Sequence, residues 1–139
     1  PVTVLFCDLD DFKAVNDTHG HLVGDQVLVA VAQTLRRELR GHDGLGRFGG
    51  DEFVVILDSV DPVEMEQVAA RLCAAISALR FDNDLRISVS LGVAHHSPGQ
   101  VRPDLQDLLR QADSDLMVVK SNRRSRPQSA TARPRALHR

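Results

Sequence analysis

The sequence has 139 residues, of which 42% are hydrophobic and 26% charged, with a formal net charge of −2. This length and composition predict one globular domain, and no apolar run approaches the roughly 20 residues of a membrane-spanning helix. Residues 1–119 carry ten basic side chains against nineteen acidic ones, a net of −9, and the chain has no Trp or Tyr, which argues against nucleic acid as a partner. Cys7 and Cys73 lie in apolar segments without metal-binding or redox spacing, so we expect buried thiols and a cytoplasmic location.

The N-terminal part of the chain predicts one strand and two helices. Residues 2–9 are almost all apolar, which is typical of a strand that is covered on both faces. Residues 11–17 predict a short helix that ends near Gly20. Residues 23–40 repeat apolar side chains at helical spacing and predict a long amphipathic helix.

A hairpin is predicted next. Two short strand-like runs, 45–48 and 52–57, are separated by Gly49 and Gly50, and two glycines between such runs indicate a tight turn. We expect Phe48, at the start of this turn, to lie in the core.

Three further elements complete the predicted domain. Residues 62–79 and 104–120 repeat apolar side chains at helical spacing, and residues 85–94 alternate as a strand does. The chain beyond the last helix is rich in Arg, Ser, Ala and Pro and has almost no large apolar residue. We therefore assign residues 1–124 to the domain and residues 125–139 to a basic, disordered tail.

This order of elements predicts an α/β fold (an α+β sandwich) with a central antiparallel sheet flanked by helices, of the ferredoxin-like or nucleotidyl-cyclase-like kind. In that topology the first strand lies between the last strand and the second strand of the hairpin. The C-terminal end of the first strand then meets the start of the strand that follows the two glycines. We therefore expect Asp8 and Asp10 to lie close to Asp51 and Glu52.

Such a cluster of carboxylates is costly without a cation, because like charges repel and partial burial raises the cost. Oxygen ligands at one edge of a sheet, with room left for phosphate, suit Mg²⁺ better than Zn²⁺. Two interpretations stay open here: a magnesium site, or solvated acids at the ends of strands. The convergence favours the metal, and the glycine pair, which lets backbone or a ligand approach closely, adds to it.

The residues around this turn resemble a known family. Residues 49–53 read GGDEF, the signature of diguanylate cyclases. The resemblance extends over about residues 2–124, and four further runs carry it: DLDDFKAVNDTHGHLVGD, RFGGDEFVVIL, ISVSLGVA and QADSDLMVVK. It implies that the chain begins after the family's usual N-terminal turn and linker helix, and that an upstream sensor or regulatory domain belongs to the parent chain.

The resemblance implies a role for the carboxylates. Asp8 and Asp51 match the residues that hold Mg²⁺ (or Mn²⁺) in the family, together with the backbone carbonyl of Leu9. Glu52 matches a proposed metal ligand or general base, so Asp8, Asp51 and Glu52 form the expected catalytic set.

The resemblance also implies how GTP binds. Asn16 and Asp25 match the pair that reads guanine, and a carboxylate suits the N1–H and amino donors of that base. The residues implied to contact or surround the phosphates are Asp11, Phe12, Lys13, Gly49, Gly50, Lys120 and Arg124.

An RxxD motif precedes the signature. Arg40 and Asp43 match the inhibitory site that binds the product in many members, and Arg71 lies where some members supply a further arginine. The chain departs from the family at the end of its last helix, where Met117 replaces a tyrosine and Arg123 a glycine.

The implied activity is the Mg²⁺-dependent condensation of two GTP into cyclic di-GMP by a two-fold homodimer. Three other interpretations stay open. The chain could be a catalytically silent member that senses GTP or cyclic di-GMP, a different nucleotidyl cyclase, or a metal-binding domain whose basic tail binds a membrane or nucleic acid.

Overall fold

The computed structural model describes residues 1–97, 99, 101 and 103–124, so the tail expected at 125–139 lies outside the described residues. The elements, in chain order, are β1 (Val2–Leu9), α1 (Phe12–His19), α2 (His21–Glu38), β2 (Gly44–Arg47), β3 (Glu52–Asp58), α3 (Pro62–Ser77), a 3₁₀ turn (Asp82–Asp84), β4 (Val89–His96) and α4 (Leu105–Arg124). Each predicted helix and strand is present, with ends shifted by a few residues.

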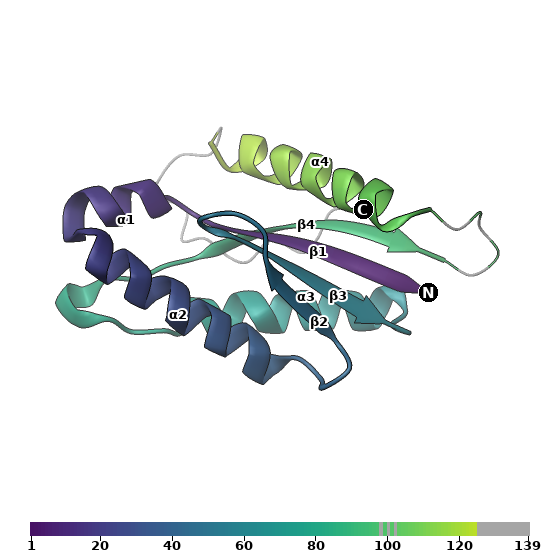
Figure 1. The fold of residues 1–139 in the computed structure, drawn as a ribbon, viewed down its shortest axis with the longest axis horizontal. Coiled ribbons are helices and arrows are strands. Elements are labelled where there is room, and N and C mark those ends of the chain that lie inside the picture. Colours follow the sequence, from purple (N-terminus) through teal and green to yellow (C-terminus); the bar gives the residue numbers. More distant parts are fainter. Residues whose placement is uncertain (98, 100, 102, 125–139) are drawn as a thin grey trace.

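The four strands form one antiparallel sheet in the order β2-β3-β1-β4. The predicted topology is therefore confirmed, with β1 between β3 and β4. The register pairs Asp8 with Glu52 across to β3 and Leu9 with Val89 across to β4. Figure 1 shows α4 on one face of this sheet and α2 and α3 on the other.

Alternate residues of β1 enter two separate cores. Leu5, Cys7 and Leu9 pack with α2 and α3, whereas Val4 and Phe6 pack with α4. Because side chains alternate along a strand, the next residues of the second set, at positions 8 and 10, project toward the α4 face. The alternation of side chains along β1 thus decides on which face of the sheet the carboxylates at its end lie.

The contact between α4 and β4 depends on Gly92. A Cβ at this position would lie 2.1 Å from the carbonyl oxygen of Ala112 and 2.4 Å from the backbone nitrogen of Leu116. Both atoms belong to the helix backbone, so only glycine lets α4 approach β4 this closely.

Two expectations were wrong in detail. The last strand begins at Val89 and not at residue 85, because β1 ends at Leu9 and offers no ladder partner farther on. Phe48 is 63% exposed, and its ring makes an edge-on contact with Phe6, with centroids 5.4 Å apart. Because β2 is the edge strand of the sheet, no neighbouring strand covers it on that side.

The two cysteine thiols are free, as expected; Cys7 is buried and Cys73 is partly buried. No helix within the described part of the chain has the length and hydropathy needed to cross a membrane.

Candidate functional site

Asp8 is the centre of the predicted carboxylate cluster. It lies at the end of β1 on the α4 face, and its Oδ2 forms an ion pair with Nζ of Lys120 from α4. Its other oxygen, Oδ1, is buried and has no hydrogen-bond partner. Burial raises the pKa of Asp8, Lys120 opposes the rise, and the nearby Asp51 carboxylate adds to it.

Asp51 and Glu52 meet this strand end from β3, as predicted. The backbone N–H of Leu9 donates to the carbonyl of Asp51 at 3.1 Å, and Glu52 pairs with Asp8 across the ladder. Burial, followed by the charges of Asp8, Asp51 and Asp113, raises the pKa of Glu52. Burial is thus the main cause of the raised pKa of both Asp8 and Glu52, and the neighbouring carboxylates add to it.

The turn between β2 and β3 is shaped by its neighbours. A Cβ on Gly49 would lie 2.6 Å from Oε1 of Glu52, so any other residue there would displace the Glu52 side chain. Arg47 orders the turn: its guanidinium donates to the carbonyl of Gly49 at 3.2 Å and to that of Gly50 at 2.8 Å. Arg47 was not among the predicted site residues; it lies two residues before the signature.

The cluster was tested for its fit to a divalent metal ion. Among the described residues, no group of three or more His, Cys, Asp or Glu side chains is arranged to hold a metal. The predicted ligand set is of another kind than such a group, because it consists of two carboxylates, Asp8 and Asp51, and one backbone carbonyl. The buried Asp8 Oδ1 without a partner fits such an ion, since a buried carboxylate oxygen is otherwise left unsatisfied. Hard oxygen donors of this kind suit Mg²⁺.

Asp10 is not part of this cluster, contrary to the prediction. Its carboxylate accepts hydrogen bonds from the hydroxyls of Ser88 and Ser90, both at 2.6 Å, and forms an ion pair with Arg123 of α4. The pairing of β1 with β3 ends at Asp8 and Glu52. Beyond it the chain stays beside β4, and the Asp10 N–H donates to the carbonyl of Ser88.

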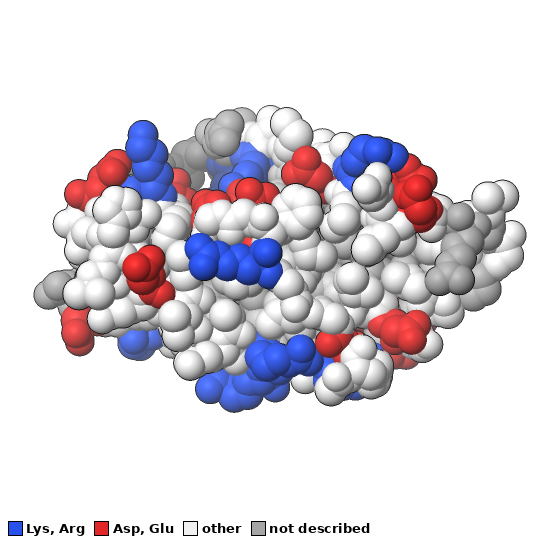
Figure 2. Space-filling model, viewed as in Figure 1, with Lys and Arg blue, Asp and Glu red and all other residues white. Residues whose placement is uncertain are grey.

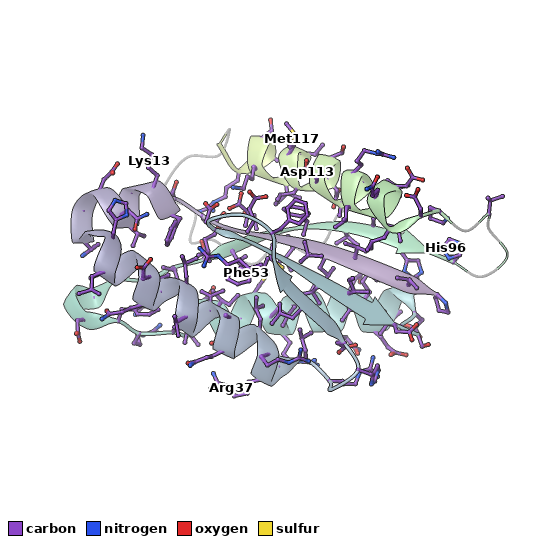
Figure 3. The ribbon with its side chains drawn as sticks, viewed as in Figure 1. Lys13, Arg37, Phe53, His96, Asp113 and Met117 are labelled. Carbon is purple, nitrogen blue, oxygen red and sulfur yellow. The ribbon has the colours of Figure 1, made fainter. Side chains whose placement is uncertain are left out.

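The predicted phosphate-binding residues lie on both sides of the carboxylates. Asp11 joins β1 to α1 in the left-handed conformation, with φ of 56°, and Phe12 begins the helix. Lys120 contacts Asp8, whereas Lys13 is exposed and extends outward from α1 (Figure 3). Arg124 ends α4, and its side chain is outside the described part of the chain.

The predicted guanine-reading pair lies on two adjoining helices. Asn16 comes from α1 and Asp25 from α2, and the Asn16 Oδ1 atom is buried without a hydrogen-bond partner. A Cβ on Gly24 would lie 1.8 Å from that atom, so the glycine of α2 makes the space that Asn16 occupies.

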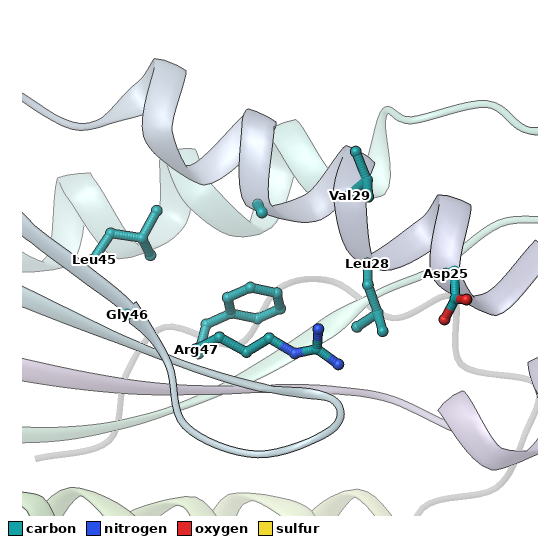
Figure 4. Close-up of a pocket in the computed structure, with 8 residues that line it drawn as sticks. Asp25, Leu28, Val29, Leu45, Gly46 and Arg47 are labelled. Atoms are coloured by element: carbon teal, nitrogen blue, oxygen red, sulfur yellow. The ribbon is translucent and has the colours of Figure 1, made fainter.

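A pocket of about 480 Å³ lies between α2 and the β2–β3 hairpin. Its walls comprise Asp25, Leu28, Val29, Ala32, Leu45, Gly46, Arg47 and Phe53. In Figure 4 the guanidinium of Arg47 extends along the pocket toward Leu28 and Asp25. A mostly apolar wall with a carboxylate at one end is a surface that a planar base with N–H donors could occupy.

The RxxD residues form a compact turn after α2. The backbone N–H of Arg40 donates to Asp43 Oδ2 at 2.8 Å, and the Arg40 guanidinium lies 3.7 Å from the same oxygen. The side chain of Asp43 is 3% exposed. Arg36 also holds this turn, because its guanidinium donates to the carbonyls of Arg40 and Asp43. It was not among the predicted residues.

Arg71 reaches the same end of α2 from α3. Its guanidinium donates to the carbonyl of Glu38 at 2.9 Å and lies 3.3 Å from the Glu38 carboxylate. The structure thus brings Arg36, Arg40 and Arg71 to one helix end, where exposed carbonyls favour positive charge.

Acidic and basic side chains meet beside the β2–β3 turn, between α1 and α4, on the face shown in Figure 2. The ion pairs of Asp8 and Asp10 with α4 account for part of this mixture.

Comparisons with known proteins agree with this geometry. Residues 1–126 match the family model described as the diguanylate cyclase GGDEF domain. The bifunctional diguanylate cyclase/cyclic di-GMP phosphodiesterase MucR of Pseudomonas aeruginosa is 38% identical over 125 residues, which are 88% of this chain and 18% of MucR.

Two solved structures are similar throughout the fold. The GGDEF domain of YfiN (TpbB) from Pseudomonas aeruginosa superposes with a TM-score of 0.78 at 34% identity, covering 87% of this chain and 76% of that one. The GGDEF domain of DgcB from Caulobacter crescentus, in complex with cyclic di-GMP, gives 0.76 at 28% identity, covering 90% and 74%. By contrast, the chain spans only 18% to 34% of the length of the first curated relatives.

Proposed function

The chain belongs to the diguanylate cyclase GGDEF domain family, and from this premise we propose that it condenses two GTP molecules into cyclic di-GMP and two pyrophosphates. The observation that carries the proposal is the junction of β1 and β3. There Asp8, with one buried and unpartnered oxygen, lies against the signature residues Asp51 and Glu52 and the charge of Lys120.

The first role of the junction is to hold a cation. Asp8 and Asp51, with the backbone carbonyl of Leu9, would hold Mg²⁺ or Mn²⁺. Such an ion neutralises phosphate charge and activates the attacking hydroxyl when it is bound. An ion held by Asp8 Oδ1 leaves the Lys120 pair on Oδ2 in place, whereas one that also takes Oδ2 would open this pair and release an ammonium group beside the position of the phosphates. Glu52, whose pKa is raised, is the candidate base for the 3′-hydroxyl proton.

The second role is to select guanine. Asp25 can accept from the N1–H and amino group of guanine, and adenine lacks that pair of donors. Asn16 presents a buried oxygen without a partner, which a donor on the base would satisfy. With the base toward α2 and the phosphates toward α4, one nucleotide spans the end of β1.

One domain supplies only half of the reaction. The 3′-hydroxyl of each GTP must attack the α-phosphate of the other, so two copies have to face each other about a two-fold axis. The two domains then each orient one nucleotide for in-line displacement. We expect regulatory segments of a longer parent chain to bring the copies together, in the cytoplasm where GTP is available.

Product inhibition through the RxxD turn is part of the proposal. Arg40 and Arg71 present guanidinium groups suited to phosphates and guanine edges, and Asp43 fixes the turn. The DgcB structure holds cyclic di-GMP in a related domain, which supports the product as a ligand.

Nucleotide binding tests the site. Isothermal titration of the chain should show GTP binding that strengthens with Mg²⁺, and ATP binding that is weaker. Asp51→Asn should remove the dependence on Mg²⁺, and Asp25→Asn should reduce the preference for GTP. Asp58→Asn, at the exposed far end of β3, is the matched control and should behave like the parent. Equal affinity for ATP, or a Mg²⁺ effect that survives Asp51→Asn, would contradict the assignment.

A further inference from the structure

Two ion pairs join the end of β1 to the last turns of α4. Asp8 pairs with Lys120 and Asp10 with Arg123. Asp8 lies in β1 and Asp10 lies one residue beyond its end, while Lys120 and Arg123 are three residues apart on α4 and so share one face of the helix. The pairs therefore lie side by side between the same two elements.

The two pairs differ in how fully they are satisfied. The side chain of Asp10 is 6% exposed and has three partners: Ser88, Ser90 and Arg123. The side chain of Asp8 is 16% exposed and keeps one buried oxygen without any partner. Opening the Asp10 pair would leave a buried charge uncompensated, which is costly. The Asp8 pair is the one that a competing ligand can open.

We propose that Arg123 is a positioning residue: it holds the end of α4 against the β1–α1 junction while Lys120 leaves Asp8 to meet the phosphates of GTP. This inference rests on the proposed function. The resemblance places a glycine at this position in the family, so the anchor is a property of this chain.

The anchor also reaches the junction itself. A second nitrogen of the Arg123 guanidinium lies 3.9 Å from the carboxylate of Asp11. Asp11 adopts the left-handed conformation, which Asp and Asn enter more readily than other residues with a side chain. Its backbone N–H and that of Phe12 are the expected phosphate donors. Arg123 thus links the end of α4 to the segment before α1, tightly through Asp10 and loosely through the exposed Asp11 side chain.

The test separates the phosphates from the base. GTP binding is measured by isothermal titration with Mg²⁺, and guanosine binding by NMR titration, for the full chain and for Arg123→Ala. We expect Arg123→Ala to weaken GTP binding about tenfold, because the junction must then be ordered during binding, and to leave guanosine binding unchanged. Arg110→Ala removes an ion pair within α4, with the exposed Asp107, and is the matched control. It should change neither affinity.

A second comparison distinguishes positioning from direct contact. If Arg123 acts through Asp10, Asp10→Asn weakens GTP binding as much as Arg123→Ala does. The double variant then binds GTP with the same affinity as either single variant. If Arg123 contacts phosphate itself, Asp10→Asn leaves GTP binding intact or strengthens it, and the inference is overturned. A parallel loss of guanosine binding would also overturn it, because it would reveal a general loss of structure.

The proposed function fails separately from this inference. If the parent chain binds GTP no better than guanosine, the proposed phosphate site is contradicted, and so is this inference. If the parent chain binds GTP much more tightly than guanosine and Arg123→Ala does the same, only the role of Arg123 is contradicted.

Discussion

At the scale of single residues, the site holds partly buried carboxylates close together, which disfavours their charged forms. The pKa values of Asp8 and Glu52 are raised chiefly by burial and by the neighbouring carboxylates. A folded chain with a raised carboxyl pKa binds that proton more tightly than the unfolded chain does. Its stability therefore falls as the pH rises through the raised pKa, and recovers on acidification.

Glu52→Gln tests this cost directly. In Mg²⁺-free buffer near neutral pH the variant should melt at a higher temperature than the parent, because it lacks one of three mutually repelling carboxylates. The gain should shrink as the pH falls toward 4.5, the ordinary pKa of Glu, where the parent is also protonated. Calorimetry at several pH values measures it, with exposed Glu64→Gln on α3 as the control. A lower melting temperature for Glu52→Gln at neutral pH would contradict the assignment.

Gly24→Ala tests the place of Asn16 in base recognition. The new methyl group would collide with the Asn16 side chain, which can rotate away without moving the backbone. We expect the fold to persist and GTP binding to weaken about tenfold, the value of roughly one hydrogen bond. Gly41→Ala, where nothing lies within 4 Å of an added Cβ, provides the comparison. Unchanged GTP affinity in Gly24→Ala would show that Asn16 does not read the base.

The predictability of the site residues follows from strand geometry. Asp8, Asp51 and Glu52 could be predicted to meet because an antiparallel register places the end of one strand beside the start of the next. The partners of Asp10 and the role of Arg47 could not, because they depend on where α4 ends and how the turn lies.

At the scale of elements, α4 decides the geometry of the site. It supplies Lys120 and Arg123 to the end of β1, and its approach to the sheet is set by the bare backbone of Gly92. Apolar periodicity predicted the helix itself. It could not predict the extension to Arg124, because the final residues are polar and are held by ion pairs that only the fold creates.

Gly92→Ala should displace this helix. Its Cβ would meet backbone atoms of α4, which cannot rotate away, so we expect a loss of about 1–3 kcal/mol in the free energy of unfolding. Urea denaturation measures the loss, and Gly46→Ala on β2, where an added Cβ meets nothing within 4 Å, is the control. GTP binding should weaken in parallel, because Lys120 moves with the helix. A Gly92→Ala chain as stable as the parent would mean that α4 is not held by this contact.

The hairpin and β4 show the limits of reading elements from pattern alone. The two glycines predicted the turn, yet Phe48 beside them is exposed because β2 is an edge strand. The alternating pattern before Val89 continues without pairing, since a strand needs a neighbour and β1 ends at Leu9.

At the scale of the whole molecule, the proposed reaction needs two copies of the domain. The fold brings the cluster of Asp8, Asp51 and Glu52 together with Lys120 and Arg123 of α4, a pocket lies between α2 and the β2–β3 hairpin, and the RxxD turn lies at the C-terminal end of α2. A chain that binds GTP alone should turn it over only when two copies meet, so the initial rate per molecule should rise with protein concentration. A rate per molecule that is independent of concentration for a monomer would contradict the two-fold assembly.

The central claim is tested most directly by enforced dimerisation. The domain is fused to a dimerising coiled coil and incubated with GTP and Mg²⁺, its dimeric state is verified by light scattering, and the nucleotides are separated by chromatography and identified by mass. We predict cyclic di-GMP and pyrophosphate from the parent fusion and neither from Asp51→Ala. A dimeric fusion that binds GTP but forms no cyclic di-GMP would contradict the claim, and would indicate a domain that binds nucleotide without joining it.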